Sequence, residues 1–368
     1  MSAAPPIPTR PRSRLRRLAS PFVAPPVFDF WARKVDPTWT WERPLARVVG
    51  HAPAAVGTVT LTLQPNRHWA GARPGQHVNL GADIGGVRTT RSYSLDAPVG
   101  ADGRITLTVK GIDGGRMSAH LRDPARLGDV LDIGPGFGDL VLPERVAGAW
   151  LFLAAGSGIT PLMALARQLA AKGMPVPATL LYWARTRAEL CFVGELRALA
   201  ARHAGFDVRF VLTGEAPEAA DEAGGRIGAA LLDARVPDLA QRQAYACGPG
   251  GFVAAAEALL DGRVPLLRSE AFTPLPRPPV DDTGTVAVRL ARSGRTLQLP
   301  RGTALLDALE AEGLKLRSGC RMGICNTCAC GKPSGVARDL RTGAASGEPA
   351  TALKLCVSSA ATDLVLDL

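Results

Sequence analysis

Apolar and polar residues alternate along the first third of the chain, after its N-terminal segment. Residues 58–63 place Val59, Leu61 and Leu63 on one face, and residues 104–109 repeat the pattern. Strict alternation is typical of half-buried antiparallel strands, whose successive side chains point to opposite faces of a sheet. Several such strands between glycine-rich turns predict a small antiparallel β-barrel.

The pattern changes near residue 149, where a continuous apolar run replaces the alternation. Residues 150–155 predict a buried parallel strand, a glycine turn follows at 156–158, and residues 160–172 have helical periodicity. Strand-like and helical segments then continue to alternate, at 179–183, 195–204 and 206–212. This order predicts a doubly wound α/β domain with a largely parallel sheet.

The last part of the chain has a third pattern. Residues 286–290 and 297–299 alternate around a short turn, which predicts a β-hairpin. Thr303 is a candidate cap for a helix that stops at Gly313, and residues 363–368 predict a closing strand. Two strands, one helix, a cysteine-rich loop and a final strand predict a β-grasp domain of the α+β class.

These patterns divide the 368 residues into several domains, as the length alone suggests. Four prolines between residues 274 and 279 predict a stiff linker. The predicted parts are a basic proline-rich head (1–36), the β-barrel domain (37–146), the α/β domain (147–273), the linker (274–284) and the β-grasp domain (285–368).

Composition supports a folded, turn-rich protein. Hydrophobic residues make up 46% of the chain, enough for sizeable cores, and 40 glycines with 30 prolines exclude an all-helical fold. Four of the seven cysteines lie between Cys320 and Cys330. Such crowding indicates metal ligation in a reducing compartment and not a disulfide framework.

The net charge of +10 is concentrated in the head, which we expect to be disordered. Five of its six arginines lie close together, at Arg10, Arg12, Arg14, Arg16 and Arg17. The head is either a solvated tail or a basic arm that meets anionic lipid or an acidic partner. Nucleic acid is not expected as a partner, because no recognition module accompanies the arginines.

The segment after the arginines does not have the pattern of a membrane span. Pro21, Pro25 and Pro26 interrupt its apolar stretch, which is too short to cross a bilayer. Residues 28–41 are rich in aromatic side chains that could dock on a core, a partner or a lipid interface. We predict a cytoplasmic protein, with peripheral contact at the inner face of the membrane as one possibility.

The cysteine spacing is the most specific chemical signal. Cys320, Cys325 and Cys328 form C-x4-C-x2-C, and Cys356 follows 27 residues later, which is the plant-type [2Fe-2S] spacing. Small neighbouring residues let backbone N–H groups approach the sulfurs. A zinc site would favour two separated C-x2-C pairs. We therefore predict these four cysteines as cluster ligands and Cys330 as an additional thiol.

Arg91-Ser92-Tyr93-Ser94 resembles the R-x-Y-S motif of the ferredoxin-NADP reductase family of flavoproteins. The resemblance implies that Tyr93 stacks on the flavin ring of FAD, Arg91 pairs with its pyrophosphate and Ser94 hydrogen-bonds near flavin N5. A phenol offers a flat stacking face, and a guanidinium binds phosphate oxygens with two hydrogen bonds. A glycine turn at the start of the next helix would receive the flavin phosphates, at Gly115, Met117 and Ser118.

Two further motifs of the same family follow in order. The G-x-G-x-x-P motif lacks the last glycine of the usual dinucleotide fingerprint and comprises Gly156, Gly158, Thr160 and Pro161. Glycine there lets backbone approach the coenzyme. Cys247-Gly248-Pro249 matches the family's C-G-P segment, which implies that Cys247 lies beside nicotinamide C4. Glu270 lies in a sequence that resembles the family's E-x-F segment, which implies a carboxylate near the flavin edge.

Two arginines carry the coenzyme choice. Arg185 and Arg187 follow the second strand of the predicted α/β domain, where an acidic residue would pair with a ribose 2′-hydroxyl and an arginine suits a 2′-phosphate. NADPH is therefore expected in preference to NADH.

The resemblance covers residues 40–368 and implies an enzyme. It would pass hydride from NADPH to FAD, with Ser94, Cys247 and Glu270 as catalytic residues, and single electrons through the [2Fe-2S] cluster. Residues 28–31, 65–69, 75–78 and 320–325 look most like bacterial reductases that feed membrane acyl desaturases. A soluble ring-hydroxylating oxygenase or a cytochrome P450 is the alternative acceptor, and a redox sensor is the alternative of another class.

Overall fold

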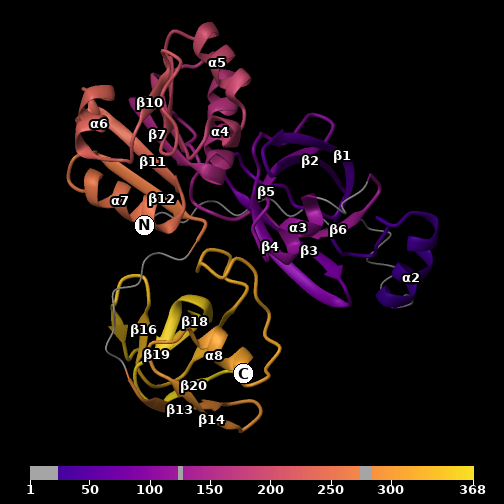
Figure 1. Cartoon of the computed structure of the whole chain (residues 1–368). Coiled ribbons are helices and arrows are strands. Elements are labelled where there is room, and N and C mark those ends of the chain that lie inside the picture. The colour runs from indigo at the N-terminus through magenta and orange to yellow at the C-terminus, as the bar shows by residue number, and fades with distance from the viewer. Residues whose placement is uncertain (1–23, 123–126, 274–282) are drawn as a thin grey trace. The chain divides into compact units, whose positions relative to one another are not determined.

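The computed structural model describes residues 24–122, 127–273 and 283–368. The chain divides into two compact units, Met1–Glu270 and Ala271–Leu368 (Figure 1). The five clustered arginines of the predicted head, at 10–17, and the four prolines of the predicted linker, at 274–279, lie outside the described residues. The predicted multi-domain fold class, with a barrel, an α/β sheet and a β-grasp, is confirmed.

The first unit begins its sheet structure with six antiparallel strands. In spatial order they are β4 (Val87–Ser94), β3 (His77–Ile84), β6 (Val130–Ile133), β1 (Leu45–Ala55), β2 (Thr58–Pro65) and β5 (Ile105–Lys110). Just beyond β4, the Asp96 N–H donates to Thr106 O of β5 at 3.2 Å and joins the two edges into a barrel. The inward apolar positions predicted at residues 59, 61 and 63 are buried in its core.

Two helices accompany the barrel. Helix α3 (Arg116–Arg122) contributes Met117 and Leu121 to the barrel core. Helix α2 (Pro25–Val35) precedes the barrel and lies within the predicted head, so the expectation of disorder is wrong for this part of it. The helix was not predicted from sequence, because its two prolines look like helix breakers. They occupy the first helical positions, where a missing N–H leaves no hydrogen bond unmade.

The second part of the first unit is a six-stranded sheet with helices on both faces (Figure 1). Its strand order is β10 (Glu222–Gly224), β9 (Phe206–Leu212), β8 (Ala178–Ala184), β7 (Ala149–Ala155), β11 (Arg242–Gly248) and β12 (Leu266–Ala271). The covering helices are α4 (Ile159–Ala170), α5 (Val193–Arg202), α6 (Ala229–Arg235) and α7 (Gly250–Leu260). The continuous apolar runs of the sequence are the central strands, buried on both faces.

Polar contacts join the barrel to this sheet. Arg167 of α4 donates to the buried carboxylate of Asp96 at 3.0 Å and to its backbone oxygen at 2.8 Å. Tyr245 of β11 donates its hydroxyl to Val141 O at 2.8 Å. A buried arginine–carboxylate contact is strongly directional, so it fixes the register of the two layers.

The second unit has a three-stranded sheet formed by β14 (Thr296–Pro300), β13 (Thr285–Leu290) and β20 (Leu364–Leu366). Helix α8 (Leu305–Ala311) packs on it and ends before Gly313, as predicted. Thr303 is not its cap. Ala304 occupies the N-cap, because the helix begins where Leu305 and Leu306 turn into the core.

Two small sheets complete the second unit, and the sequence patterns did not predict them. Strand β15 (Ala329–Lys332) pairs with β18 (Ala350–Lys354), and β16 (Ala337–Asp339) pairs with both β17 (Ala345–Ser346) and β19 (Ser358–Ala360). Across the described residues of both units, every helix is too short or too polar to cross a membrane.

Candidate redox sites

The end of strand β4 carries the residues of the R-x-Y-S motif. Arg91 is exposed, and Tyr93 is half-buried against the barrel core, where burial raises the pKa of its phenol. The Ser94 side chain is only 4% exposed, yet its Oγ has no hydrogen-bond partner among the described residues. A buried hydroxyl without a protein partner fits a site in which a bound group would accept its hydrogen bond.

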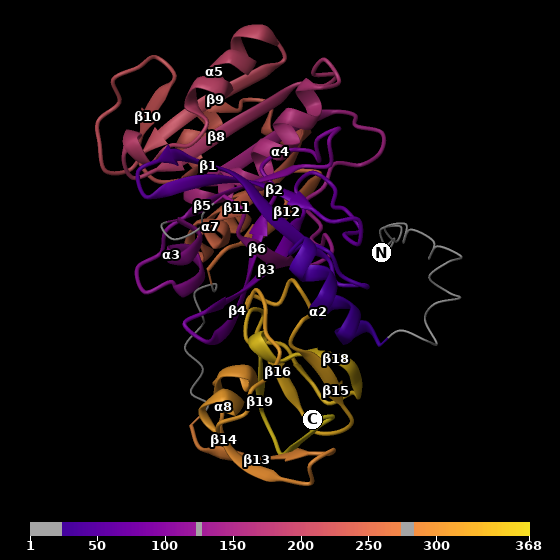
Figure 2. The same cartoon turned by 90° about the vertical axis from the view of Figure 1, so that its right-hand side faces the viewer.

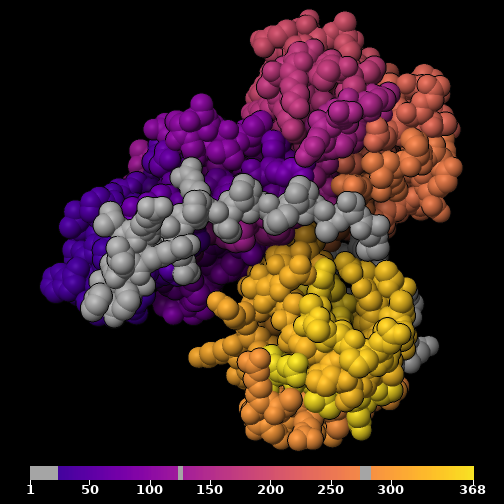
Figure 3. Space-filling model, turned by 180° about the vertical axis from the view of Figure 1, so that it is seen from behind, coloured from indigo at the N-terminus to yellow at the C-terminus, as the bar shows by residue number. Residues whose placement is uncertain are grey.

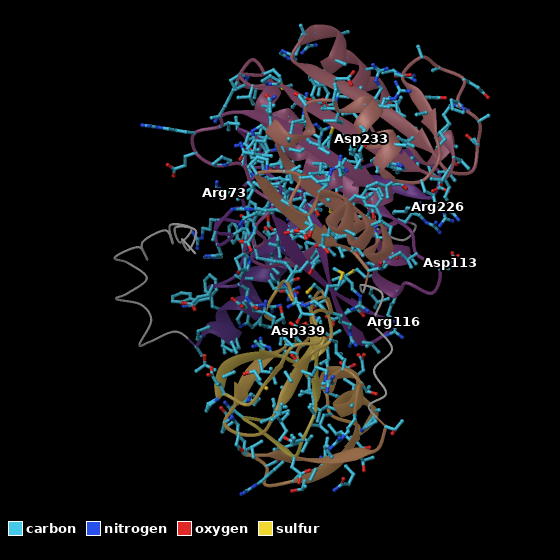
Figure 4. All side chains as sticks on the ribbon, turned by 90° about the vertical axis from the view of Figure 1, so that its left-hand side faces the viewer. Arg73, Asp113, Arg116, Arg226, Asp233 and Asp339 are labelled. Atoms are coloured by element: carbon cyan, nitrogen blue, oxygen red, sulfur yellow. The ribbon has the colours of Figure 1, made fainter. Side chains whose placement is uncertain are left out.

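In the glycine turn before α3, backbone groups and not side chains are available to a ligand. A Cβ on Gly115 would lie 2.8 Å from Ile112 O, so this turn requires glycine. Ser118 Oγ donates to Gly115 O at 3.1 Å and accepts from the Ile112 N–H at 3.2 Å, and Met117 is buried. The exposed Arg116, which sequence reasoning did not select, is a cation at the surface of this turn (Figure 4).

The structure brings the G-x-G-x-x-P turn and the C-G-P segment together. Gly158 ends a short 3-10 helix, η1 (Gly156–Gly158), directly against the end of β11. A Cβ on Gly158 would lie 2.1 Å from Cys247 O and 2.6 Å from Gly248 N. Thr160 and Pro161 are buried in α4, and Thr160 Oγ1 donates to Ser157 O at 3.0 Å. Pro249 follows as the N-cap of α7.

Glu270, at the end of β12, meets a residue that the sequence analysis missed. Its Oε2 lies 3.1 Å from His77 Nε2, and the two side chains are 8% and 2% exposed. The Asp139 N–H donates to the other carboxylate oxygen at 3.3 Å. His77 is opposite Ser94 in the register of β3 and β4, so Ser94 lies on the strand next to the residue that contacts Glu270.

Burial sets the charge of this cluster. It raises the pKa of Glu270 to about 7 and lowers the pKa of His77 to about 4. It also raises the pKa of the Cys247 thiol well above its usual value, and the nearby carboxylate of Glu270 adds to this effect. Near pH 7 the cluster therefore combines a neutral imidazole, a neutral thiol and a carboxyl group close to its midpoint.

The Glu270 carboxyl should make the stability of the first unit depend on pH. The folded protein keeps its proton to about pH 7, whereas the group ordinarily titrates at 4.5. The protonated carboxyl therefore contributes to the free energy of unfolding fully below pH 4.5, and this contribution is lost as the pH rises through 7. Glutamine at this position does not titrate. The free energy of unfolding of Glu270→Gln, relative to that of wild type, should thus increase by on the order of 2 kcal/mol from pH 5 to pH 8.

Tryptophan fluorescence during urea denaturation measures this effect, because all six tryptophans precede residue 184 and report on the first unit alone. Glu144→Gln, which changes an exposed carboxyl, is the matched control and should keep the wild-type pH profile. A Glu270→Gln profile parallel to that of wild type would show that Glu270 is not buried as described.

The two arginines after β8 have different surroundings. The Arg185 side chain is 76% exposed and makes a surface ion pair with Glu189 at 2.9 Å. The Arg187 guanidinium donates two hydrogen bonds of 2.8 Å to the buried carboxylate of Glu222. Its further carboxylate neighbours are Glu215 and Glu218. Arg187 is therefore held by protein carboxylates, whereas Arg185 can reach a ligand.

A second exposed arginine lies at the same edge of the sheet. Leu212 of β9 is in parallel register with Ala184 of β8 and with Gly224 of β10. Arg226 follows β10 as Arg185 follows β8, so both leave the carboxyl edge of the sheet, and Arg226 is exposed (Figure 4). The position of Arg226 at this edge follows only from the strand register, because β10 is too short to be recognised from sequence.

In the second unit, the cysteine loop turns its backbone toward a sulfur. Left-handed backbone at Arg321, Gly323 and Asn326 gives the loop its shape. Arg321 donates to both carboxylate oxygens of Glu310, at 2.7 and 2.8 Å, which ties the loop to α8. Three N–H groups then donate to Cys320 Sγ at 3.3–3.4 Å, those of Met322, Ile324 and Cys325.

The four thiols associate in two pairs. A hydrogen bond from Cys320 lowers the pKa of Cys325 to about 5, and one from Cys356 lowers the pKa of Cys328 to about 6. Within the described ranges, no three His, Cys, Asp or Glu side chains are placed to hold one metal ion. Two thiolates for each iron are what a [2Fe-2S] cluster requires, so this arrangement is compatible with one. Cys330 packs against the hydrophobic core.

Three family models match the chain in the order of its domains. The oxidoreductase FAD-binding domain matches residues 53–141, the oxidoreductase NAD-binding domain residues 152–258, and the 2Fe-2S iron-sulfur cluster binding domain residues 288–358. Fold, sites and matches together define an oxidoreductase that uses FAD, NAD(P)H and a [2Fe-2S] cluster. The predicted cofactors and enzyme class are thereby confirmed.

The chain is 34% identical to an NADPH oxidoreductase of Mycobacterium tuberculosis over 362 residues, which cover 96% of this chain and 92% of that protein. It belongs to this family of oxidoreductases. It is 26% identical to a glycine betaine monooxygenase reductase subunit of Pseudomonas aeruginosa, over 80% of this chain and 87% of that one. The solved structure of phthalate dioxygenase reductase matches with a TM-score of 0.56 and 25% identity, over 88% of this chain and 97% of that one.

Proposed function

We propose that this protein transfers electrons from NADPH to an oxygen-activating acceptor through its own two redox groups. When bound, FAD accepts hydride from the nicotinamide and supplies single electrons to the [2Fe-2S] cluster. The observation that carries the proposal is the contact of Gly158 with Cys247 and Gly248, in the same unit as Ser94 and Glu270. Two separate family motifs thus meet at one place.

The chain's own residues bind and orient the groups. Tyr93 supplies a stacking face, Arg91 and the backbone around Gly115 to Ser118 bind the flavin phosphates, and the Ser94 hydroxyl donates to the flavin edge. The buried Ser94 Oγ, which lacks a protein partner among the described residues, supports this role. The turn at Gly156 and Gly158 would receive the pyrophosphate of the coenzyme, with Gly248 and Pro249 opposite. Thr160 and Pro161 begin helix α4 behind this turn and support it.

Cys247 and Glu270 complete the catalytic group. Both are buried, which excludes water from the place where hydride would pass. The neutral thiol of Cys247 offers a small, uncharged surface to the nicotinamide. His77 fixes the side chain of Glu270 through the 3.1 Å contact and so acts as a positioning residue. A carboxyl with a pKa of about 7 can also accept or release a proton at neutral pH.

Cys320, Cys325, Cys328 and Cys356 would hold the cluster. The purified protein should show flavin absorption bands overlaid by the broad absorption of a [2Fe-2S] cluster, with about two irons per chain and no zinc. Metal analysis together with the visible spectrum makes this measurement. A colourless protein loaded with zinc would contradict the ligand assignment.

NADPH is proposed as the preferred coenzyme, with Arg185 as the main 2′-phosphate ligand and Arg226 beside it. The exposed guanidinium of Arg185 and the name of the Mycobacterium tuberculosis relative support this preference. Arg185→Ala should raise the KM for NADPH about tenfold or more and leave the KM for NADH nearly unchanged, because a charge-assisted hydrogen bond is lost.

Arg187→Ala is the matched comparison for that experiment. Arg187 was predicted as a second phosphate ligand, but its ion pair with Glu222 indicates a structural role. Its loss should lower the stability of the first unit and change both KM values alike. Equal effects of Arg185→Ala on NADPH and NADH would refute the assignment.

The acceptor is proposed to be a membrane di-iron acyl desaturase. The stretches 28–31, 65–69 and 75–78 support this, because they look most like reductases of such enzymes. A soluble oxygenase is the second candidate, and the name of the monooxygenase reductase relative favours it. Purified reductase added with NADPH to membranes that contain a desaturase, or to a soluble oxygenase component, distinguishes the two by product formation.

A further inference from the structure

Helix α2 carries an exposed apolar face that electron transfer does not use. Val27, Phe30, Trp31 and Val35 are 59%, 58%, 66% and 75% exposed, and no residue of the helix is buried. Their spacing of three, four and eight residues places all four on one side of the helix. Large apolar side chains gathered in this way usually mark an interaction surface.

The opposite side of the helix is seated on the protein, which fixes the direction of the exposed face. The Trp41 N–H donates to Asp29 Oδ1 at 2.5 Å. Phe28 packs edge-to-face on Trp41 with ring centroids 5.2 Å apart. The apolar face is therefore held outward and is not a disordered segment that happens to be exposed.

The exposed charged side chains of the helix are positive. Arg33 and Lys34 lie in the last turn, and Lys34 Nζ is 5.5 Å from the centroid of the Phe30 ring. Asp29, the only carboxylate of the helix, is engaged by Trp41. Asp36, just after the helix, binds Arg47 at 2.6 Å.

Two neighbouring features add further aromatic and basic residues near the helix. A pocket of about 440 Å³ beside the helix is lined by Phe28, the exposed Trp39 and Arg67, among others. In the sequence, five arginines between residues 10 and 17 precede the helix. Tryptophan and phenylalanine next to lysine and arginine are typical of helices that lie in the headgroup region of a membrane.

We propose that helix α2 docks the reductase on an anionic membrane surface, with Phe30 and Trp31 entering the headgroup region and Arg33 and Lys34 contacting lipid phosphates. The inference rests on the proposed membrane-bound acceptor. With 11 residues the helix is too short to span a bilayer, so it lies in the plane of the surface. It sits at the end of the barrel away from the nucleotide-binding sheet (Figures 2 and 3), which leaves the coenzyme end free.

Binding of the full-length protein to vesicles tests this docking. Full-length protein should sediment with vesicles of equal parts phosphatidylcholine and phosphatidylglycerol, less at high salt, and hardly with pure phosphatidylcholine. The double variant Phe30→Ser/Trp31→Ser should bind the anionic vesicles about tenfold more weakly or worse, since its apolar anchors are lost. Val56→Ser/Val87→Ser removes two exposed apolar side chains from the barrel and should bind as wild type does.

NADPH-ferricyanide activity, measured without vesicles, confirms that each variant is folded and tests the reductase separately. Wild-type binding by Phe30→Ser/Trp31→Ser would overturn the proposal, as would equal binding of the full-length protein to neutral vesicles. A concentration-dependent dimer that this double variant abolishes would assign the face to a second copy and also overturn it. If the wild-type protein had no NADPH-ferricyanide activity, the proposed function would be wrong, whereas the result of the vesicle experiment would not be affected.

Discussion

Cys328→Ala should stop electron delivery to a protein acceptor while NADPH-dependent reduction of ferricyanide stays close to the wild-type rate. Cys328 is a proposed cluster ligand in the second unit, and the flavin and coenzyme residues all lie in the first. Without the cluster there is no one-electron relay, so acceptor turnover should fall by more than about 100-fold. Ferricyanide can take electrons from the flavin directly. Product formation by the acceptor and ferricyanide bleaching are measured in parallel.

Cys330→Ala is the control at a neighbouring cysteine. Cys330 lies two residues further along, outside the C-x4-C-x2-C spacing, and packs against the core of the second unit. Its replacement should spare the cluster absorption and both activities. If Cys330→Ala removed the cluster, the ligand set would be wrong. If Cys328→Ala also abolished flavin reduction by NADPH, the two units would not be the separate modules that we propose.

Gly158→Ala should lower the rate of flavin reduction by NADPH about 100-fold or more. The new Cβ would lie 2.1 Å from Cys247 O, far inside contact distance, so the turn and strand β11 must move apart. A displacement of about 1 Å at a reacting centre commonly costs about 100-fold in rate. Anaerobic mixing with NADPH, followed by flavin bleaching, measures the effect.

Gly194→Ala is the matched control for this change. Gly194 lies in helix α5, and an added Cβ there meets nothing within 4 Å. Alanine also favours the helix, so stability should rise slightly. In Gly158→Ala, chemical reduction of the flavin by dithionite should remain normal. A wild-type rate with NADPH in this variant would show that the two motifs need no close approach for hydride transfer.

Much of the fold was predictable because its hydrophobic patterns are local. Alternation at residues 58–63 and 104–109 predicted the barrel strands, and the continuous runs at 150–155 and 179–183 predicted the central parallel strands. Helix α2 was missed because Pro25 and Pro26 disfavour helix only in its interior. The Thr303 cap was wrong because packing of the apolar residues that follow, and not the hydroxyl, set the start of α8.

The candidate sites were predictable where a motif is contiguous. The cysteine spacing and the R-x-Y-S, G-x-G-x-x-P and C-G-P segments each lie within a short stretch. His77 was missed because its role depends on Glu270, which is 193 positions away and reaches it only in the folded unit. Arg187 was predicted as a secondary ligand, and its ion pair with Glu222 could not be predicted because the two residues are 35 positions apart.

Electrons are proposed to pass from NADPH to the flavin and then singly through the cluster. Anaerobic rapid mixing with NADPH, combined with freeze-quenched electron paramagnetic resonance, tests it most directly. We expect flavin bleaching first, followed by the signal of a reduced [2Fe-2S] cluster, and no such signal in a flavin-free preparation of the same protein. Acceptor turnover while the cluster stays oxidised, or cluster reduction by NADPH without flavin, would show that electrons do not follow this route.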